Sequence, residues 1–170
     1  MKPNFEKLPE NFHKYLNLVN EDNVIEALRK SQDKFVARLK SIPEQNGDFR
    51  YDRGKWSIKE VVNHVIDVER VFAYRALSFA RGDKAQLPGF DDQDWTLAAQ
   101  SDRRKLSELI EEYNNVRGAT ISLFESFTNE MLLKEGVANK GTFSVVNLGY
   151  IIAGHETHHG TILNDRYMAS

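Results

Sequence analysis

The sequence predicts an all-α fold, a four-helix bundle with a long crossover connection between its second and third helices. Apolar residues recur at helical spacing over four stretches of roughly 20 to 25 residues each. Prolines are sparse and lie between these stretches, and no segment alternates cleanly in the manner of a β-strand. Four long amphipathic helices in one chain favour a bundle.

The first helix is expected over residues 23–42. Asp22 or Asn20 is expected to cap its start, because both side chains can accept a hydrogen bond from a free backbone N–H group. Pro43 ends it, since proline disfavours a helical conformation of the residue before it.

The second helix is expected over residues 57–80. Ser57 and Glu60 form a capping box, in which the hydroxyl accepts a backbone N–H and the carboxylate reaches back to the cap residue. Gly82 suits the C-terminal cap. The segment 81–95 then reads as a long connection, which predicts that the second and third helices run parallel.

The third and fourth helices are expected over residues 103–127 and 144–167. A loop that contains Gly136 and Gly141 separates them. With 170 residues, one domain spanning residues 1–170 is expected, in which the roughly 20 N-terminal residues form an extension.

Composition excludes several classes of function. The formal net charge is −2 and no Lys/Arg-rich block occurs, so we expect no nucleic-acid partner. The absence of cysteine excludes disulfides, thiolate metal ligands and cysteine nucleophiles. The polar start MKPNFEKLPENF is unlike a secretory signal, and no apolar run approaches the roughly 20 residues of a membrane helix. We therefore expect no membrane association and a cytoplasmic location.

Three of the five histidines lie in the stretch GHETHHG, residues 154–160. On a helical wheel His155 and His159 lie in the middle of the apolar stripe of the fourth helix, one turn apart. His158 and Glu156 lie at its two margins, so we expect His158 to be a surface or supporting residue and Glu156 to be solvated or salt-bridged. Two inward imidazoles one turn apart can bind one metal ion, although a pair of hydrogen-bonded core histidines is the alternative.

A third ligand must come from another helix. His64, inside the second helix, lies on the shoulder of its buried face, which suits a ligand at a pocket wall. The alternative for His64 is a partly exposed side chain beside Asp67. His13 precedes the bundle and is expected to be an ordinary surface residue.

The string His155-Glu156-x-x-His159 also matches a metalloprotease motif. Such proteases need a third ligand downstream, either a glutamate or a further histidine. Only GTILNDRYMAS follows His159, and it contains neither. The sequence therefore argues against proteolysis.

Three passages together resemble the DinB-like superfamily of metal-binding four-helix bundles, which includes YfiT-type proteins. They are KWSIKEVVNH at 55–64, VERVFAYR at 68–75 leading to Arg-Gly-Asp at 81–83, and GHETHH at 154–159. The likeness covers roughly residues 24 to 167. It implies a metal ion held by His64, His155 and His159, and activities that include hydrolases and thiol-dependent transferases.

Three histidine nitrogens suit Zn, Ni, Fe or Mn, and catalytic sites of this kind keep an open position for water or substrate. We expect a metal-dependent hydrolase or thiol S-transferase that acts on a small molecule. The catalytic acid or base is unknown from sequence; Asp67, Glu60 and Glu156 are the nearest candidates by helical geometry. Arg75 and Trp56 are candidates for orienting a substrate, although packing explains both equally well.

Two other functions stay open at this point. One is a metal-binding bundle without catalysis, a sensor, chaperone or dimerisation module, which predicts a closed coordination shell. The other is a metal-free helical interaction protein. We also consider a homodimer, because small bundles often pair through helix faces, and a thiol as the small-molecule partner.

Overall fold

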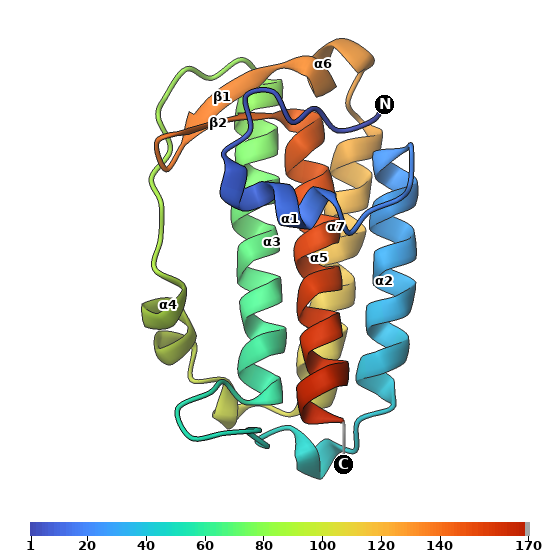
Figure 1. The fold of residues 1–170 in the computed structure, drawn as a ribbon, viewed down its shortest axis with the longest axis vertical. Coiled ribbons are helices and arrows are strands. Elements are labelled where there is room, and N and C mark those ends of the chain that lie inside the picture. Colours follow the sequence, from blue (N-terminus) through green and yellow to red (C-terminus); the bar gives the residue numbers. More distant parts are fainter. Residues whose placement is uncertain (169–170) are drawn as a thin grey trace.

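The computed structural model describes residues 1–168, and four long helices dominate it (Figure 1). They are α2 (Val24–Lys40), α3 (Ile58–Ala80), α5 (Leu106–Glu125) and α7 (Val145–Ile162). Their axes lie along the long axis of the molecule, side by side. The predicted all-α four-helix bundle is confirmed, and each long helix lies within the residues expected for it.

The order of the helices in the bundle explains the long crossover. In Figure 1, α2 and α7 run downward whereas α3 and α5 run upward. Both α5 and α7 pack against α2 and against α3, so α2 lies diagonally across from α3. The connection between residues 80 and 106 therefore returns along the whole bundle to join two parallel neighbours, as the sequence predicted.

The ends of α2 and α3 follow from their capping residues. Asn23, and not Asp22 or Asn20, caps α2, because its side chain accepts hydrogen bonds from the backbone N–H groups of Ile25 and Glu26. The capping box of Ser57 and Glu60 starts α3 as predicted. After α3, Gly82 adopts a φ of 84°, a left-handed conformation that glycine adopts without strain.

The crossover contains a helix that the sequence analysis missed. Asp91 caps α4 (Asp92–Ala99) by accepting the backbone N–H groups of Gln93 and Asp94. A 3₁₀ turn, Ser101–Arg103, leads from α4 to α5. The segment expected as a plain connection is thus partly helical, and it lies against α3.

A β-hairpin between α5 and α7 is a small addition to the all-α bundle, in a segment that the sequence analysis expected to be a loop. After the short helix α6 (Asn129–Leu133), strand β1 (Glu135–Ala138) pairs antiparallel with β2 (Gly141–Ser144). The two turn residues between them, Asn139 and Lys140, have φ values of 45° and 64°. Positive φ at both positions is the geometry of a two-residue type I′ hairpin turn.

The N-terminal segment is packed onto the bundle. A 3₁₀ turn (Glu10–Phe12) leads into α1 (His13–Leu16), which packs against α7. His13, expected as a surface residue, is half-buried and lies outside the bundle core, and its Nε2 lies 3.1 Å from the carbonyl oxygen of Leu8. A second 3₁₀ turn, Glu44–Asn46, follows α2, and α7 continues into a π-helical turn, Leu163–Tyr167.

Buried side chains form two apolar clusters, one in each half of the bundle. Between them lies a layer of buried polar and charged side chains to which all four long helices contribute. Its members are Ser31 of α2, His64 and Glu69 of α3, Arg117 of α5, and His155 and Glu156 of α7. Among residues 1–168, no helix is long and apolar enough to cross a membrane.

Gly154 allows α1 to approach α7, and its replacement gives a first prediction. A Cβ atom at this position would lie 2.1 Å from the backbone oxygen of Tyr15. We expect Gly154→Ala to displace α1 and to lower the free energy of unfolding by about 1–3 kcal/mol. Gly118→Ala on α5 is the control, since nothing lies within 4 Å there and alanine favours a helix by up to about 1 kcal/mol. Urea unfolding measures both, and equal effects would contradict the packing described.

Candidate metal centre

The three histidines expected from the sequence lie together. The Nε2 atom of His155 is 3.1 Å from Nε2 of His64 and 3.1 Å from Nε2 of His159. One ring nitrogen of each of the three lies within 4.8 Å of the others. His155 and His159 are one turn apart on α7, and His64 faces them from α3. That these rings bind an ion stays a prediction, but the structure brings the whole set together.

Burial keeps these imidazoles neutral. It lowers the pKa of His64 to about 4, and together with the neighbouring rings it lowers the pKa of His159 to about 3. The pKa of His155 is lowered well below its usual value for the same reasons. A neutral imidazole has a free nitrogen lone pair at neutral pH, which is the form that binds metal ions.

The donor set fits a divalent transition metal. Two nitrogens that each lie 2.0–2.1 Å from a tetrahedral ion are about 3.3 Å apart, close to the spacing of the Nε2 atoms. Without an ion, the 3.1 Å contacts would have to be N–H···N hydrogen bonds, with the single Nε2 atom of His155 serving both other rings. His159 Nδ1 is also buried without a hydrogen-bond partner among the described residues. Among residues 1–168, no fourth His, Cys, Asp or Glu joins the group.

Aromatic rings hold the three imidazoles in position. The Trp56 ring lies 4.7 Å from that of His64 and stacks at 6.5 Å on that of His159. Its indole N–H donates to Gln93 of α4 at 3.0 Å, which joins α4 to the site. From the N-terminal segment, Tyr15 packs edge-on against His155 with ring centroids 5.3 Å apart. The residues expected as an extension therefore contribute directly to the site.

Asp92 is the site residue that sequence reasoning missed. Its Oδ1 lies 3.9 Å from Nδ1 of His64, on the side of the ring away from the other two histidines. Metal-bound histidines commonly direct their second nitrogen at a carboxylate in this way. Partial burial and the adjacent Asp91 raise the pKa of Asp92. The only sequence signal was the helix cap Asp91, which places Asp92 in the first turn of α4.

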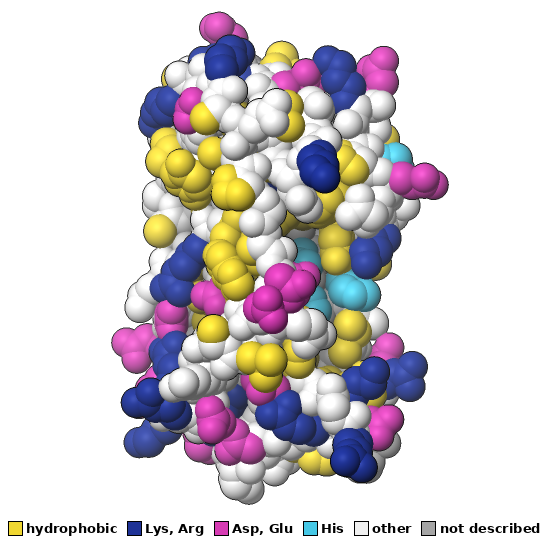
Figure 2. Space-filling view, turned by 90° about the vertical axis from the view of Figure 1, so that its left-hand side faces the viewer, with side chains coloured by type: hydrophobic (Ala, Val, Ile, Leu, Met, Phe, Trp, Pro, Cys, Tyr) yellow, Lys and Arg dark blue, Asp and Glu magenta, His cyan; other side chains and the backbone are white. Residues whose placement is uncertain are grey.

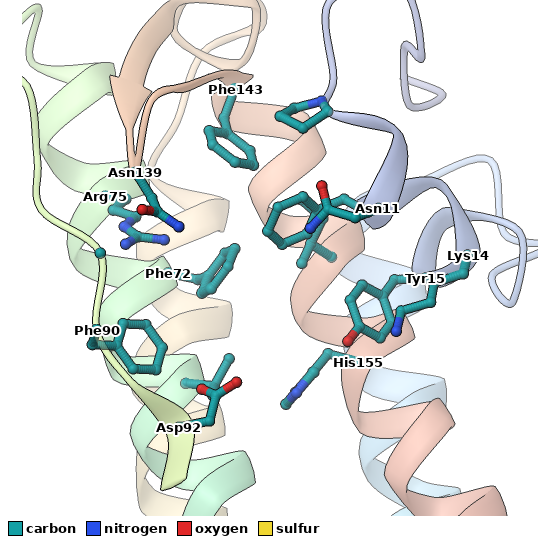
Figure 3. A pocket seen from close by; sticks show the side chains of 15 residues that line it. Asn11, Lys14, Tyr15, Phe72, Arg75, Phe90, Asp92, Asn139, Phe143 and His155 are labelled. Carbon is teal, nitrogen blue, oxygen red and sulfur yellow. The ribbon is translucent and has the colours of Figure 1, made fainter. Parts of the chain in front are cut away.

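A pocket of about 300 Å³ opens beside the site, and of the three histidines it is His155, rather than the expected His64, that lines it. Figure 2 shows histidine side chains at the bottom of a hollow on this face of the molecule, beside a cluster of acidic side chains. In Figure 3, Asp92 and His155 face each other across one end of the pocket, whereas Arg75 and Asn139 lie at the other end. The apolar wall between the two ends includes Phe72 and Phe90.

Glu156 lies in the core, away from the pocket. Of the two alternatives expected for it, a solvated side chain is wrong and a salt bridge is confirmed. Glu156 is 1% exposed and pairs with Arg117 of α5. Arg117 also donates two hydrogen bonds of 2.9 Å to Glu69, and Tyr113 donates one of 2.5 Å to Glu156. Burial raises the pKa of Glu156 to about 7. This network fixes the rotation of α7 at the residue next to His155.

The other two carboxylates suggested by helical geometry also point elsewhere. Glu60 is occupied by the cap of α3 and by an ion pair with Arg50. Asp67 accepts a hydrogen bond from Asn63 at 2.7 Å and lines a different surface pocket. Among residues 1–168, Asp92 is therefore the carboxylate that lies within 4 Å of a ring nitrogen of the three histidines.

The depressed histidine pKa values predict how acid affects the metal-free protein. Between about pH 6.5 and 4 the unfolded chain binds protons that folded His64, His155 and His159 do not. The contribution of these histidines to stability is therefore complete above pH 6.5 and is lost as the pH falls. Each histidine contributes up to about 1.4 kcal/mol per pH unit. Glu156, whose folded pKa is raised, acts in the opposite direction and offsets one of them.

Urea unfolding of chelator-treated protein at pH 6.5 and pH 5 measures this effect. We expect a clearly lower midpoint at pH 5, and a smaller drop in a His159→Gln variant. A midpoint that is equal or higher at pH 5 would contradict the buried, neutral state of the histidines.

Comparisons with known proteins agree with this geometry. A protein of Oceanobacillus iheyensis named "Putative metal-dependent hydrolase" is 25% identical over 123 residues, which cover 71% of this chain and 70% of the relative. The structure of YfiT from Bacillus subtilis, described as a probable metal-dependent hydrolase with an unusual four-helix bundle topology, matches with a TM-score of 0.73 and 18% identity. That match covers 99% of this chain and 94% of YfiT.

The mycothiol-dependent maleylpyruvate isomerase matches with a TM-score of 0.69 and 10% identity, over 81% of this chain and 58% of the isomerase. At these identities both structural matches show a shared fold and nothing more. The family model of the DinB superfamily, however, matches residues 27–163, most of the chain and all three histidines. The chain belongs to the DinB superfamily.

Proposed function

We propose that this protein is a metal-dependent enzyme, a hydrolase or a thiol-dependent transferase, that acts on a small molecule through an ion held by His64, His155 and His159. One observation carries the proposal: three neutral imidazoles converge beside a pocket, and no fourth ligand residue joins them among residues 1–168. Catalytic metal sites keep such an open position, whereas structural sites close it with a fourth protein ligand. This favours an enzyme over a non-catalytic metal-binding module.

A bound Zn, Ni, Fe or Mn ion would supply Lewis-acid activation of water, of a thiol or of a substrate carbonyl. The protein's own part begins with Asp92. Its carboxylate lies 3.9 Å from Nδ1 of His64, where its negative charge favours a proton on Nδ1 and so leaves the Nε2 lone pair free toward the other two rings. From the same position at the pocket mouth, its carboxylate can take a proton from the attacking water or thiol. Trp56 and Tyr15 fix the rings.

Reconstitution tests the proposal. Protein stripped with a chelator is reloaded with each of the four metals and assayed with p-nitrophenyl esters, and with small thiols plus an electrophile. We expect one metal to restore turnover of at least one reaction class, and His155→Ala to remain at the background rate. Turnover that is the same in stripped, reloaded and His155→Ala protein would contradict a metal-dependent enzyme.

Asp92→Asn separates metal binding from chemistry. The amide keeps the shape but cannot accept a proton, so we expect kcat to fall by about 10²-fold or more while the metal content is unchanged. Asp94→Asn is the matched control, since Asp94 lies in the same first turn of α4 but outside the pocket lining. If kcat of Asp92→Asn equals that of Asp94→Asn, Asp92 has no role in proton transfer.

A further inference from the structure

We propose that Arg75 and Asn139 recognise a carboxylate group of the ligand, at the end of the pocket away from the three histidines. The identity of that ligand as the substrate rests on the proposed function above, whereas the carboxylate site itself does not. The reasons are the unbalanced charge of Arg75, the position of Asn139 beside it, and the apolar wall that separates both from the histidines.

The guanidinium of Arg75 is buried without an acidic partner. Its side chain is 3% exposed, yet no carboxylate lies within ion-pair distance among residues 1–168. Arg117, the other buried arginine, is matched by Glu69 and Glu156. A buried unpaired charge is costly, so one that lines an open pocket indicates a site for a negatively charged ligand.

The contacts that Arg75 does make leave its charge available. One nitrogen donates to the carbonyl oxygen of Pro88 at 2.8 Å, and the guanidinium lies 5.0 Å from the ring of Phe72 and 5.9 Å from that of Phe90. These contacts hold the side chain in place, and they leave nitrogens of the fork free for the ligand. A planar guanidinium matches the two oxygens of a carboxylate.

Asn139 adds a neutral donor at the same end. It lies in the turn of the β-hairpin, where its backbone N–H donates to Leu87 at 3.0 Å and ties the hairpin to the crossover. Gly89 leaves room for its amide, since a Cβ at Gly89 would lie 2.5 Å from the side-chain oxygen of Asn139. In Figure 3 the side chains of Asn139 and Arg75 lie side by side.

The wall between the two ends sets the shape of the ligand. One face of α3 carries His64, Val68, Phe72 and Arg75, and the last three of these line the pocket. Eleven residues of helix span about 16 Å, and the arginine side chain shortens this gap by pointing toward the helix N-terminus. The pocket therefore suits a small molecule with a carboxylate, a short apolar body and a reactive group near the histidines. Asp92 at the metal end repels the carboxylate and favours this orientation.

Ligand binding to the metal-free, full-length protein tests the inference. Calorimetry compares 4-phenylbutyrate with the neutral 4-phenylbutyramide and with 3-phenylpropylphosphonate, for the wild type, Arg75→Met and Arg70→Met. Arg70 is the matched control, because it lies on the same helix but pairs with Glu112 outside this pocket. We expect the carboxylate to bind the wild type and Arg70→Met at least tenfold more tightly than the amide, and Arg75→Met to lose that preference.

Equal affinities of carboxylate and amide for the wild type would overturn the proposal, as would binding of neither compound, a preference for the phosphonate, or a preference that survives in Arg75→Met. If Arg75→Met does not fold, the same ligands are compared on the wild type and on Arg75→Lys. A preference of the wild type for the carboxylate that weakens in Arg75→Lys supports the proposal, and an unchanged preference overturns it. Because the measurement contains no metal, it can fail while metal-dependent turnover is present, and it can succeed when turnover is absent.

Discussion

Replacement of Arg117 by methionine is expected to lower the free energy of unfolding by about 3–5 kcal/mol. The change removes the one positive charge between Glu69 and Glu156, which are 2% and 1% exposed, and leaves both carboxylates buried without their partner. It also removes the hydrogen bonds to the carbonyl oxygen of Leu28 and to Ser31 of α2. Thermal unfolding of the metal-free protein measures the effect.

Arg29→Met is the control for this experiment. Arg29 forms a single ion pair with Glu125, and both side chains are about half exposed, so its loss should cost less than about 1 kcal/mol. Similar unfolding temperatures for the two variants would show that the polar layer does not hold the four helices together. A double change of Glu69 and Glu156 to leucine in the Arg117→Met background should recover much of the loss, because the unpaired charges are then gone.

Replacement of His155 by alanine is expected to weaken metal binding by at least about 10²-fold. His155 contributes the nitrogen that lies 3.1 Å from both other rings, so its loss leaves one imidazole from each of two helices. Competition with a chelator of known affinity measures the dissociation constant for each metal.

His158→Ala is the matched control for the loss of a neighbouring imidazole. His158 is half-buried, packs against Tyr15 and lies outside the three-histidine group. We expect its affinity for the metal to stay within a few-fold of the wild type. If the two variants lose affinity equally, the ion is not held by the residues assigned to it.

Helical periodicity predicted the parts of the structure that packing in long regular elements determines. The four long helices and the crossover follow from apolar spacing, from the cap at Ser57 and from the breaks at Pro43 and Gly82. The convergence of His155 and His159 follows from their spacing of one helical turn. No local rule relates α3 to α7. The prediction of His64 as the third metal ligand therefore depends on its position on the helix and on the family resemblance.

The parts that the sequence did not predict depend on tertiary contacts. Strands β1 and β2 have only four residues each, and Lys140 takes up a positive φ that the residue type does not suggest. The hairpin and the crossover stabilise each other through Leu87, which bridges to Ala138. Such pairing between distant segments leaves no periodic pattern in either one. The same is true of α4, whose packing against α3 places Asp92 beside His64.

Glu156 illustrates a second limit of reasoning from a single helix. Its place at the margin of the apolar stripe of α7 indicates either a solvated or a salt-bridged side chain, because a helical wheel does not include the partner helices. In the bundle that margin faces α5, where Arg117 and Tyr113 supply the charge and the hydrogen bond that burial of a carboxylate requires. A buried network of this kind is visible only when all four helices are placed together.

X-ray absorption at the metal edge of the reconstituted protein tests the central claim most directly. We expect one ion per chain, with three imidazole nitrogens at about 2.0–2.1 Å and one further light ligand from solvent. Loss of one imidazole from this pattern in His64→Ala, with the others retained, would support the assignment across α3 and α7. A protein that takes up no ion, or an ion surrounded by water and carboxylate oxygens alone, would contradict it.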